Sequence, residues 1–223
     1  TILNNGKIVN DIEICISDNN SSDNTINVID SYKKKLEINY YKNDKNIGVA
    51  KNILRSVEIS NSEFCWVVGD DDMLLKNSIQ EVLNLLYKYQ QADYFYINSY
   101  HFNSELLKNY KYPVDTDELP KNLSKFSSFP NSFYGKFIEL INPKISFDFL
   151  GGLYLSVFRK KNWDNNLDKI DENNINNNLL FSNIDNTYPH IKIFAHAFKD
   201  SEAFFCSRPL SINLYGVREW TSL

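Results

Sequence analysis

The stretch that decides the fold is Glu63-Phe64-Cys65-Trp66-Val67-Val68-Gly69-Asp70-Asp71-Asp72-Met73. Its apolar part is aromatic and β-branched, which is typical of a strand buried on both faces. Three adjacent carboxylates directly after a glycine do not suit a hydrophobic core, and a nearby cation or hydrogen-bond donors must relieve their repulsion. The stretch therefore predicts a buried strand with an acidic site at its end. The plainer interpretation is a solvated loop that caps the next helix.

Strands and helices alternate on both sides of this stretch. We expect further strands over 12–17, 38–42 and 93–100, and helices from about 22, over 49–59 and over 77–90. In the second helix Val49, Ile53 and Val57 are expected to be buried. This alternation predicts an α/β fold with a mostly parallel central sheet flanked by helices. The polar loops 18–23 and 43–48 and the Asp triplet would then share the C-terminal edge of the sheet, where ligands bind.

The pattern is less regular after Tyr100. The segment His101–Pro130 is too long for a simple connector, which predicts a substrate-shaping or partly mobile loop. Further on we expect a helix over 133–141, a turn at Gly151-Gly152 leading into a strand, a helix capped by Asn186 or Thr187, and short strands over 203–206 and 210–214. Without a repeat or a clear linker, we expect one domain, 1–223, with functional halves 1–100 and 101–223.

Composition excludes several classes of protein. The chain has 223 residues, of which 43% are hydrophobic, and its formal net charge of −4 does not favour a nucleic-acid partner. No apolar run approaches the roughly 20 residues of a membrane-spanning helix. Cys15, Cys65 and Cys206 lie in expected strands without metal-ligand spacing, which predicts buried, reduced thiols and a cytoplasmic protein. Loops such as Tyr110-Lys111-Tyr112 leave peripheral contact with the inner membrane face open.

The order of the polar segments resembles family 2 glycosyltransferases with the GT-A fold. The matching segments are Ser17-Asp18-Asn19-Asn20-Ser21-Ser22-Asp23-Asn24-Thr25, Asn46-Ile47-Gly48-Val49-Ala50-Lys51-Asn52 and Gly69-Asp70-Asp71-Asp72. Gly151-Gly152-Leu153, followed later by Tyr188-Pro189-His190, is similar to the bacterial subgroup that includes abequosyltransferases. The resemblance implies a metal-dependent, inverting enzyme that uses Mn²⁺ or Mg²⁺. Its donor would be a nucleotide-diphospho-sugar, and its acceptor a surface glycan or a lipid-linked glycan.

The resemblance also assigns roles to matched residues. Asp185 is the candidate base, with helix capping as the plainer interpretation. Asp72 is the candidate metal ligand, assisted by Asp70 and His190. The nucleotide-sugar would be bound by Asp18 at the nucleobase, by Asn20, Gly48, Lys51 and Asn52 beside it, and by Asp70 and Asp71 toward the ribose.

Two departures from the family pattern matter. The family's first strand and Pro-containing turn are not found before Thr1, and Thr1–Gly6 resembles the end of the following helix. A sheet edge left open in this way would favour a homodimer. At the position of the base, Ile184-Asp185-Asn186 carries one carboxylate where the family has an acidic pair. The alternative is therefore a non-catalytic member that binds a glycan or a nucleotide.

Two other acidic α/β folds fit less well. A phosphoacceptor receiver domain carries its Asp pair after the first strand, whereas the triplet here follows the third. A sugar nucleotidyltransferase needs a Gly-rich first loop with Arg or Lys, which this sequence does not have.

Overall fold

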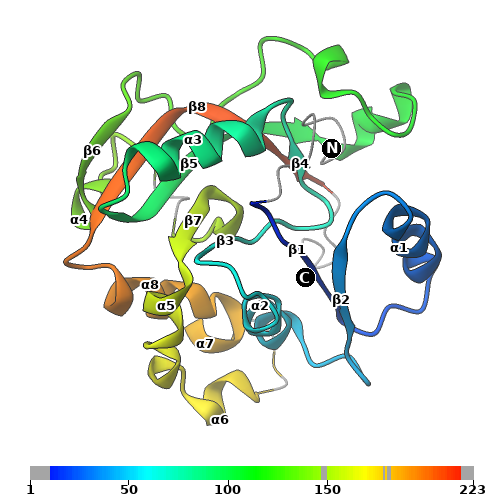
Figure 1. Ribbon diagram of the computed structural model, residues 1–223, viewed down its shortest axis with the longest axis horizontal. Coiled ribbons are helices and arrows are strands. Elements are labelled where there is room, and N and C mark those ends of the chain that lie inside the picture. Colours follow the sequence, from blue (N-terminus) through cyan, green and yellow to red (C-terminus); the bar gives the residue numbers. More distant parts are fainter. Residues whose placement is uncertain (1–10, 147–149, 178, 180–181, 217–223) are drawn as a thin grey trace. The chain divides into compact units, whose positions relative to one another are not determined.

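The structure is a computed structural model in which residues 11–146, 150–177, 179 and 182–216 are described (Figure 1). It divides into two compact units. The described residues of the α/β unit fall within Val9–Val67 and Arg159–Ala197. Those of the mixed-sheet unit fall within Val68–Phe158 and Phe198–Leu223. The expected helix end at Thr1–Gly6 lies outside the described residues.

The α/β unit begins with the predicted alternation of strands and helices. Its first elements are β1 (Ile14–Asp18), α1 (Thr25–Lys33), β2 (Ile38–Lys42), α2 (Val49–Glu58) and β3 (Phe64–Trp66). β1 and β2 pair in parallel, with Ile14 opposite Ile38 and Asp18 opposite Lys42 (Figure 1). Both strands therefore end at the same edge, as expected of a βαβ crossover.

Helix α2 buries the expected face except in its first turn, and Ile53 is half-buried. Val57 is buried as predicted, at 1% exposure, but Val49 is 58% exposed and Ala50 takes its place in the core at 4%. Val49 is the first residue of the helix, directly after Gly48, so it lies at the open end of the first turn. The inward stripe runs through Ala50 and Val57, which are two turns apart and share one face.

The second half of the α/β unit is a set of short helices. They are α5 (Lys160–Asp164), a 3-10 turn (Leu167–Lys169), α6 (Glu172–Ile175), α7 (Ile184–Thr187) and α8 (Pro189–Ala197). The cap expected at Asn186 or Thr187 is wrong, because both residues lie within α7, which Asn183 begins by accepting the Asn186 N–H, and the helix that contains Pro189 is the separate α8. Tyr188 then leaves the helical region, at φ −132° and ψ 66°, since the following proline disfavours helical backbone.

The mixed-sheet unit is built around one long strand, β8 (Glu202–Tyr215). The other elements of the unit are β4 (Met73–Leu74), α3 (Ser78–Lys88), β5 (Ala92–Asn103), β6 (Phe133–Lys136), α4 (Phe137–Leu140) and β7 (Ser156–Arg159), whose last residue falls in the α/β unit. β8 pairs in parallel with β5, while β4 and β6 pair antiparallel with β8, and β7 antiparallel with β5. The predicted α/β class holds, but this sheet is mixed rather than mostly parallel.

Two sequence expectations change in this unit. The strands expected over 203–206 and 210–214 are one strand, because Ser207–Leu210 bulge opposite Asn98, whose Nδ2 donates to Ser207 O at 2.8 Å. Pro209 lies in this bulge, where its missing N–H interrupts no ladder bond. The helix expected over 133–141 is half strand, because Phe133–Lys136 pairs with the start of β8.

The long segment after Tyr100 is packed rather than free. It forms 3-10 helices at Ser104–Asn109 and Thr116–Glu118. It also buries Leu107, Val114 and Leu119 against Met73, Ile212 and Leu214. The Asn98 side chain holds its far end, accepting the Ser127 N–H at 3.0 Å and donating to Ser127 O at 2.8 Å. This segment therefore forms a wall beside β4 and β8.

The cysteines lie in strands, as predicted. Cys65 and Cys206 are buried, Cys15 is half-buried, and all three are free thiols. Burial raises the pKa of each thiol, that of Cys15 to about 12. A raised pKa disfavours the thiolate, which is the reactive form of cysteine.

Candidate functional site

The carboxylate of Asp18 lies at the C-terminal end of β1 and is 5% exposed. Its Oδ2 accepts the Tyr40 hydroxyl at 2.6 Å, and its Oδ1 accepts the Ser21 backbone N–H at 2.7 Å. Burial raises the pKa of this carboxyl, but the two hydrogen bonds outweigh burial and the net pKa is lowered. Asp18 is therefore held as an anion in a fixed direction, with Tyr40 on β2 as a partner that the sequence analysis missed.

Asn52 ties the ends of β1 and β2 to helix α2. Its Oδ1 accepts the Ser17 hydroxyl at 2.8 Å and Asn43 Nδ2 at 2.9 Å, and its Nδ2 donates to Ser17 O at 3.1 Å. Both acceptor positions of the side chain are thus filled from within the unit. This geometry is that of a structural clamp at the strand ends.

The loops that follow β1 and β2 are joined by further hydrogen bonds. Asn19 Oδ1 accepts the Ile47 N–H at 2.9 Å, and Asn46 Oδ1 accepts the Gly48 N–H at 2.9 Å. Gly48 has φ 85° and ψ 157°, a conformation essentially restricted to glycine, and nothing lies within 4 Å of the position that a Cβ atom would take there. Asn20 is exposed at φ 66°, and Lys51 is half-buried in the first turn of α2. The backbone at Gly48 therefore borders open space.

The Asp triplet lies in the mixed-sheet unit, in the turn that leads into β4. Asp70 is exposed, and Asp71 and Asp72 are half-buried. A methyl group at Gly69 would lie 2.5 Å from Asp71 Oδ1 and 3.2 Å from Asp72 Oδ2, so two carboxylate oxygens converge above this glycine. Asn213 on β8 donates from Nδ2 to Asp72 Oδ1 at 2.8 Å.

This turn fits a hard divalent cation. Carboxylate oxygens are the donors that Mg²⁺ and Mn²⁺ prefer, and both ions complete their shells with water and phosphate oxygens. Among the described residues, no three His, Cys, Asp or Glu side chains gather as a closed metal cage. Two converging oxygens without a cage suit an ion that is shared with a phosphorylated ligand.

Asp185 lies in the first turn of α7 and is 2% exposed. Lys192 Nζ lies 3.0 Å from its Oδ1 and 2.9 Å from its Oδ2, and Asn174 Nδ2 donates to Oδ2 at 3.2 Å. The helix cap is Asn183, so capping is not the role of Asp185. Lys192 and Asn174 were not identified from the sequence, where both are ordinary polar positions.

His190 lies in α8 and is 1% exposed. Its ring packs edge-to-face against Phe194, with centroids 5.6 Å apart, and against Tyr188 at 6.0 Å. The surroundings of this imidazole are therefore aromatic.

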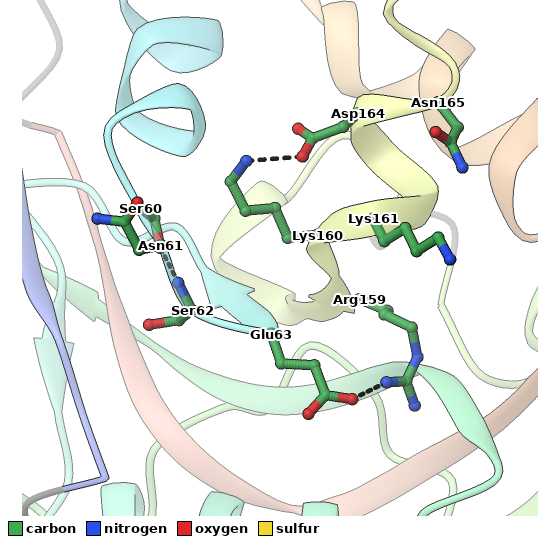
Figure 2. Close-up of a pocket in the computed structure, with 9 residues that line it drawn as sticks. All are labelled: Ser60, Asn61, Ser62, Glu63, Arg159, Lys160, Lys161, Asp164 and Asn165. Carbon is green, nitrogen blue, oxygen red and sulfur yellow. Dashed lines mark hydrogen bonds and ion pairs between the residues drawn. The ribbon is translucent and has the colours of Figure 1, made fainter.

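A polar pocket of about 500 Å³ opens on the α/β unit beside residues 60–63 and the start of α5 (Figure 2). Two of its cations have acidic partners, Arg159 with Glu63 and Lys160 with Asp164 (Figure 2). Glu13, just before β1, accepts the Asn61 N–H at 2.8 Å. The pocket therefore lies at the N-terminal ends of the strands, away from Asp18.

Comparison with known proteins identifies the family of this chain. Residues 1–160 match the family model described as glycosyl transferase family 2. Abequosyltransferase RfbV of Salmonella typhimurium is 43% identical over 81 residues, which are 35% of this chain and 24% of RfbV. An uncharacterized glycosyltransferase of Mycoplasma pneumoniae, the MG060 homolog, is 28% identical over 87 residues, which are 38% of this chain and 28% of that protein. The chain thus spans about a quarter of the length of these relatives.

Solved structures share the fold. S. aureus TarS 1–349 in complex with UDP matches with a TM-score of 0.65 at 16% identity, over 95% of this chain and 54% of the TarS chain. The TarS 1–349 complex with UDP-GlcNAc matches with a TM-score of 0.65 at 16% identity, over 99% of this chain and 54% of the TarS chain. In the described part of the chain, no helix has the length and apolar character to cross a membrane. Since the family model covers well over half of the sequence, the protein belongs to glycosyl transferase family 2 and has its GT-A fold.

Proposed function

We propose that the protein transfers a sugar from a nucleotide-diphospho-sugar to a hydroxyl of a surface glycan or a lipid-linked glycan, as one GT-A domain at the cytoplasmic side of the membrane. The observation that carries the proposal is the convergence of Asp71 Oδ1 and Asp72 Oδ2 above Gly69, in a member of family 2. Relatives named as glycosyltransferases and a fold shared with a UDP-GlcNAc complex support it.

The residues that would bind the donor follow from the family resemblance. Asp18, fixed by Tyr40 and Ser21, is placed to accept hydrogen bonds from the nucleobase. Lys51 and the open backbone at Gly48 would face the nucleotide, with Asn20 beside them, and Asp70 would face the ribose. The carboxylates of Asp71 and Asp72 would hold Mn²⁺ or Mg²⁺, which when bound neutralises the charge that develops on the departing diphosphate.

Transfer would invert the anomeric carbon. The acceptor oxygen forms a bond to that carbon as the bond to the diphosphate oxygen breaks, and the nucleoside diphosphate leaves with the bonding pair. Asp185 would take the acceptor's proton, with its carboxylate directed by Lys192 and Asn174. His190, within its aromatic surroundings, would support the helix that carries Lys192.

Calorimetric titration with UDP, GDP, CDP and dTDP, with and without Mn²⁺, tests this function. We expect one of the four to bind, and to bind more tightly with Mn²⁺. A protein that binds none of them under either condition would contradict the proposal.

The alternative is a non-catalytic member, which the single carboxylate at Ile184-Asp185-Asn186 favours. Turnover of the matching donor, measured by release of the nucleoside diphosphate, separates the two. Release that is lost in Asp185→Asn, with nucleotide binding retained, would establish catalysis. Binding without any turnover of the donor and acceptor panels would favour the alternative.

A further inference from the structure

Asn213 is an unusual residue for its place in the sheet. It alternates with the apolar residues Ile212 and Leu214 near the end of β8, yet it is only 6% exposed. β8 lies between β4 and β5, with Ile212 opposite Met73 on one side and Asn213 opposite His101 on the other. Continuing the β4 register by one residue sets Asn213 opposite Asp72. A buried polar side chain in a central strand needs a partner, and here the partner is a carboxylate.

The contact fixes one oxygen of Asp72 and orients the other. Asn213 Nδ2 donates to Oδ1 at 2.8 Å, and the backbone N–H of Gly69 donates to Oδ2 at 3.4 Å. Oδ2 is also the oxygen that converges with Asp71 Oδ1. The amide donor thus engages the oxygen that is not part of the converging pair.

We propose that Asn213 is a positioning residue for the divalent cation, directing Asp72 Oδ2 toward the ion that it shares with Asp71. This inference rests on the proposed function. A neutral amide suits the role, because it orients the carboxylate without adding a positive charge beside the cation. Outer partners of this kind typically contribute about 10–100-fold to metal affinity.

The test measures Mn²⁺ binding directly, through the electron paramagnetic resonance signal of free Mn²⁺, with UDP, GDP, CDP or dTDP present in turn. We expect Asn213→Ala and Asn213→Leu to weaken Mn²⁺ binding by roughly 10-fold or more. The matched control is Ser211→Ala, two residues away on the same strand, whose buried hydroxyl has no hydrogen-bond partner among the described residues. It should leave Mn²⁺ affinity unchanged. Thermal unfolding of each variant, followed by circular dichroism, confirms that it is folded.

A double-mutant cycle distinguishes an effect of Asn213 that acts through Asp72 from a general destabilisation of the sheet. With Asp72→Asn already present, Asn213→Ala should weaken Mn²⁺ binding no further, since the residue would act only through Asp72. If Asp72→Asn weakens binding but both folded Asn213 variants bind Mn²⁺ like the parent, the inference is overturned and the proposed function stands. If the parent binds no Mn²⁺, the metal-dependent function itself fails.

Discussion

The two acidic edges of the molecule use their polar side chains in opposite ways. At the ends of β1 and β2, Ser17, Asn43 and Asn52 bond to one another, and Asp18 is buried with both oxygens engaged. In the turn before β4, the carboxylates are at least partly exposed and Asp72 is oriented by Asn213. At the first edge the polar side chains are bonded to one another, whereas at the second the carboxylates remain accessible to a ligand. Substitutions at Asn43 and Asn52 should therefore change mainly stability, and those of the carboxylates in the turn before β4 should change mainly binding and turnover.

The largest effect is expected at Asp72. Asp72→Ala removes an oxygen of the converging pair, and we expect turnover to fall by about 100- to 1000-fold, the usual loss for one electrostatic stabiliser of a leaving group. The free energy of unfolding should also fall, by about 1–2 kcal/mol, because Asn213, which is 6% exposed, loses its acceptor. Release of the nucleoside diphosphate from a matching donor is the measurement.

Asp117→Asn is the control for this variant. Asp117 is an acidic residue of the same unit and pairs on the surface with Lys76 at 2.8 Å. It should retain parental turnover. Equal losses in both variants would show that the turn before β4 has no special role.

Asn52 tests the scaffold edge. Asn52→Ala removes three hydrogen bonds and leaves Asn43, which is 4% exposed, without its acceptor. We expect the free energy of unfolding to fall by about 2–3 kcal/mol, measured by urea denaturation. Lys51→Ala, one residue earlier, should be within about 0.5 kcal/mol of the parent but should weaken nucleotide binding. A stable Asn52→Ala with poor nucleotide affinity would reverse the assignment of this edge.

The sequence predicted one edge better than the other. Alternation and strand-end polarity correctly located β1, β2, α2 and the acidic turn, because these signals are local. The hydrogen bonds of Asn52 to Ser17 and Asn43 could not be predicted, since they join residues that are far apart in the sequence or lie in different loops. Asn213 was overlooked because it alternates with apolar residues, as a solvent-facing position of a strand would. Its partner depends on the antiparallel β4–β8 pairing, which links residues far apart in the chain.

Substitutions of Gly48 and Gly69 should separate effects on stability from effects on metal binding. Gly48→Ala meets no neighbouring atom but must hold φ 85°, so we expect about 1–2 kcal/mol of lost stability from backbone strain. In Gly69→Ala the new methyl group would displace the oxygens of Asp71 and Asp72, which are movable side chains. That variant should weaken Mn²⁺ binding with a smaller change in stability. Urea denaturation and Mn²⁺ titration of both variants test the contrast, and a reversed pattern would contradict it.

A loss of stability of similar size is expected at Tyr40, and its dependence on pH identifies the cause. Tyr40→Phe removes the hydroxyl that donates to Asp18 Oδ2 at 2.6 Å, a hydrogen bond to a charged group, and should cost about 1–2 kcal/mol of stability at pH 7. Tyr41→Phe is the control, since Tyr41 is 40% exposed and its ring, which carries the contact with Arg55, is kept.

The sign of the pH dependence follows from the two pKa shifts. The folded pKa of Asp18 lies below its unfolded value of about 4, so its contribution is present above pH 4 and is lost as the pH falls through the folded pKa. Burial and the bond to Asp18 raise the pKa of Tyr40 to about 12, so its contribution is full below about pH 10 and is lost as the pH rises toward 12. The stability difference between the parent and Tyr40→Phe should therefore be level from about pH 5 to 9 and shrink on both sides. A difference that stayed constant into acid would assign the loss to packing, and the Asp18 edge would then be less dependent on its hydrogen bonds than the comparison with the Asp72 turn requires.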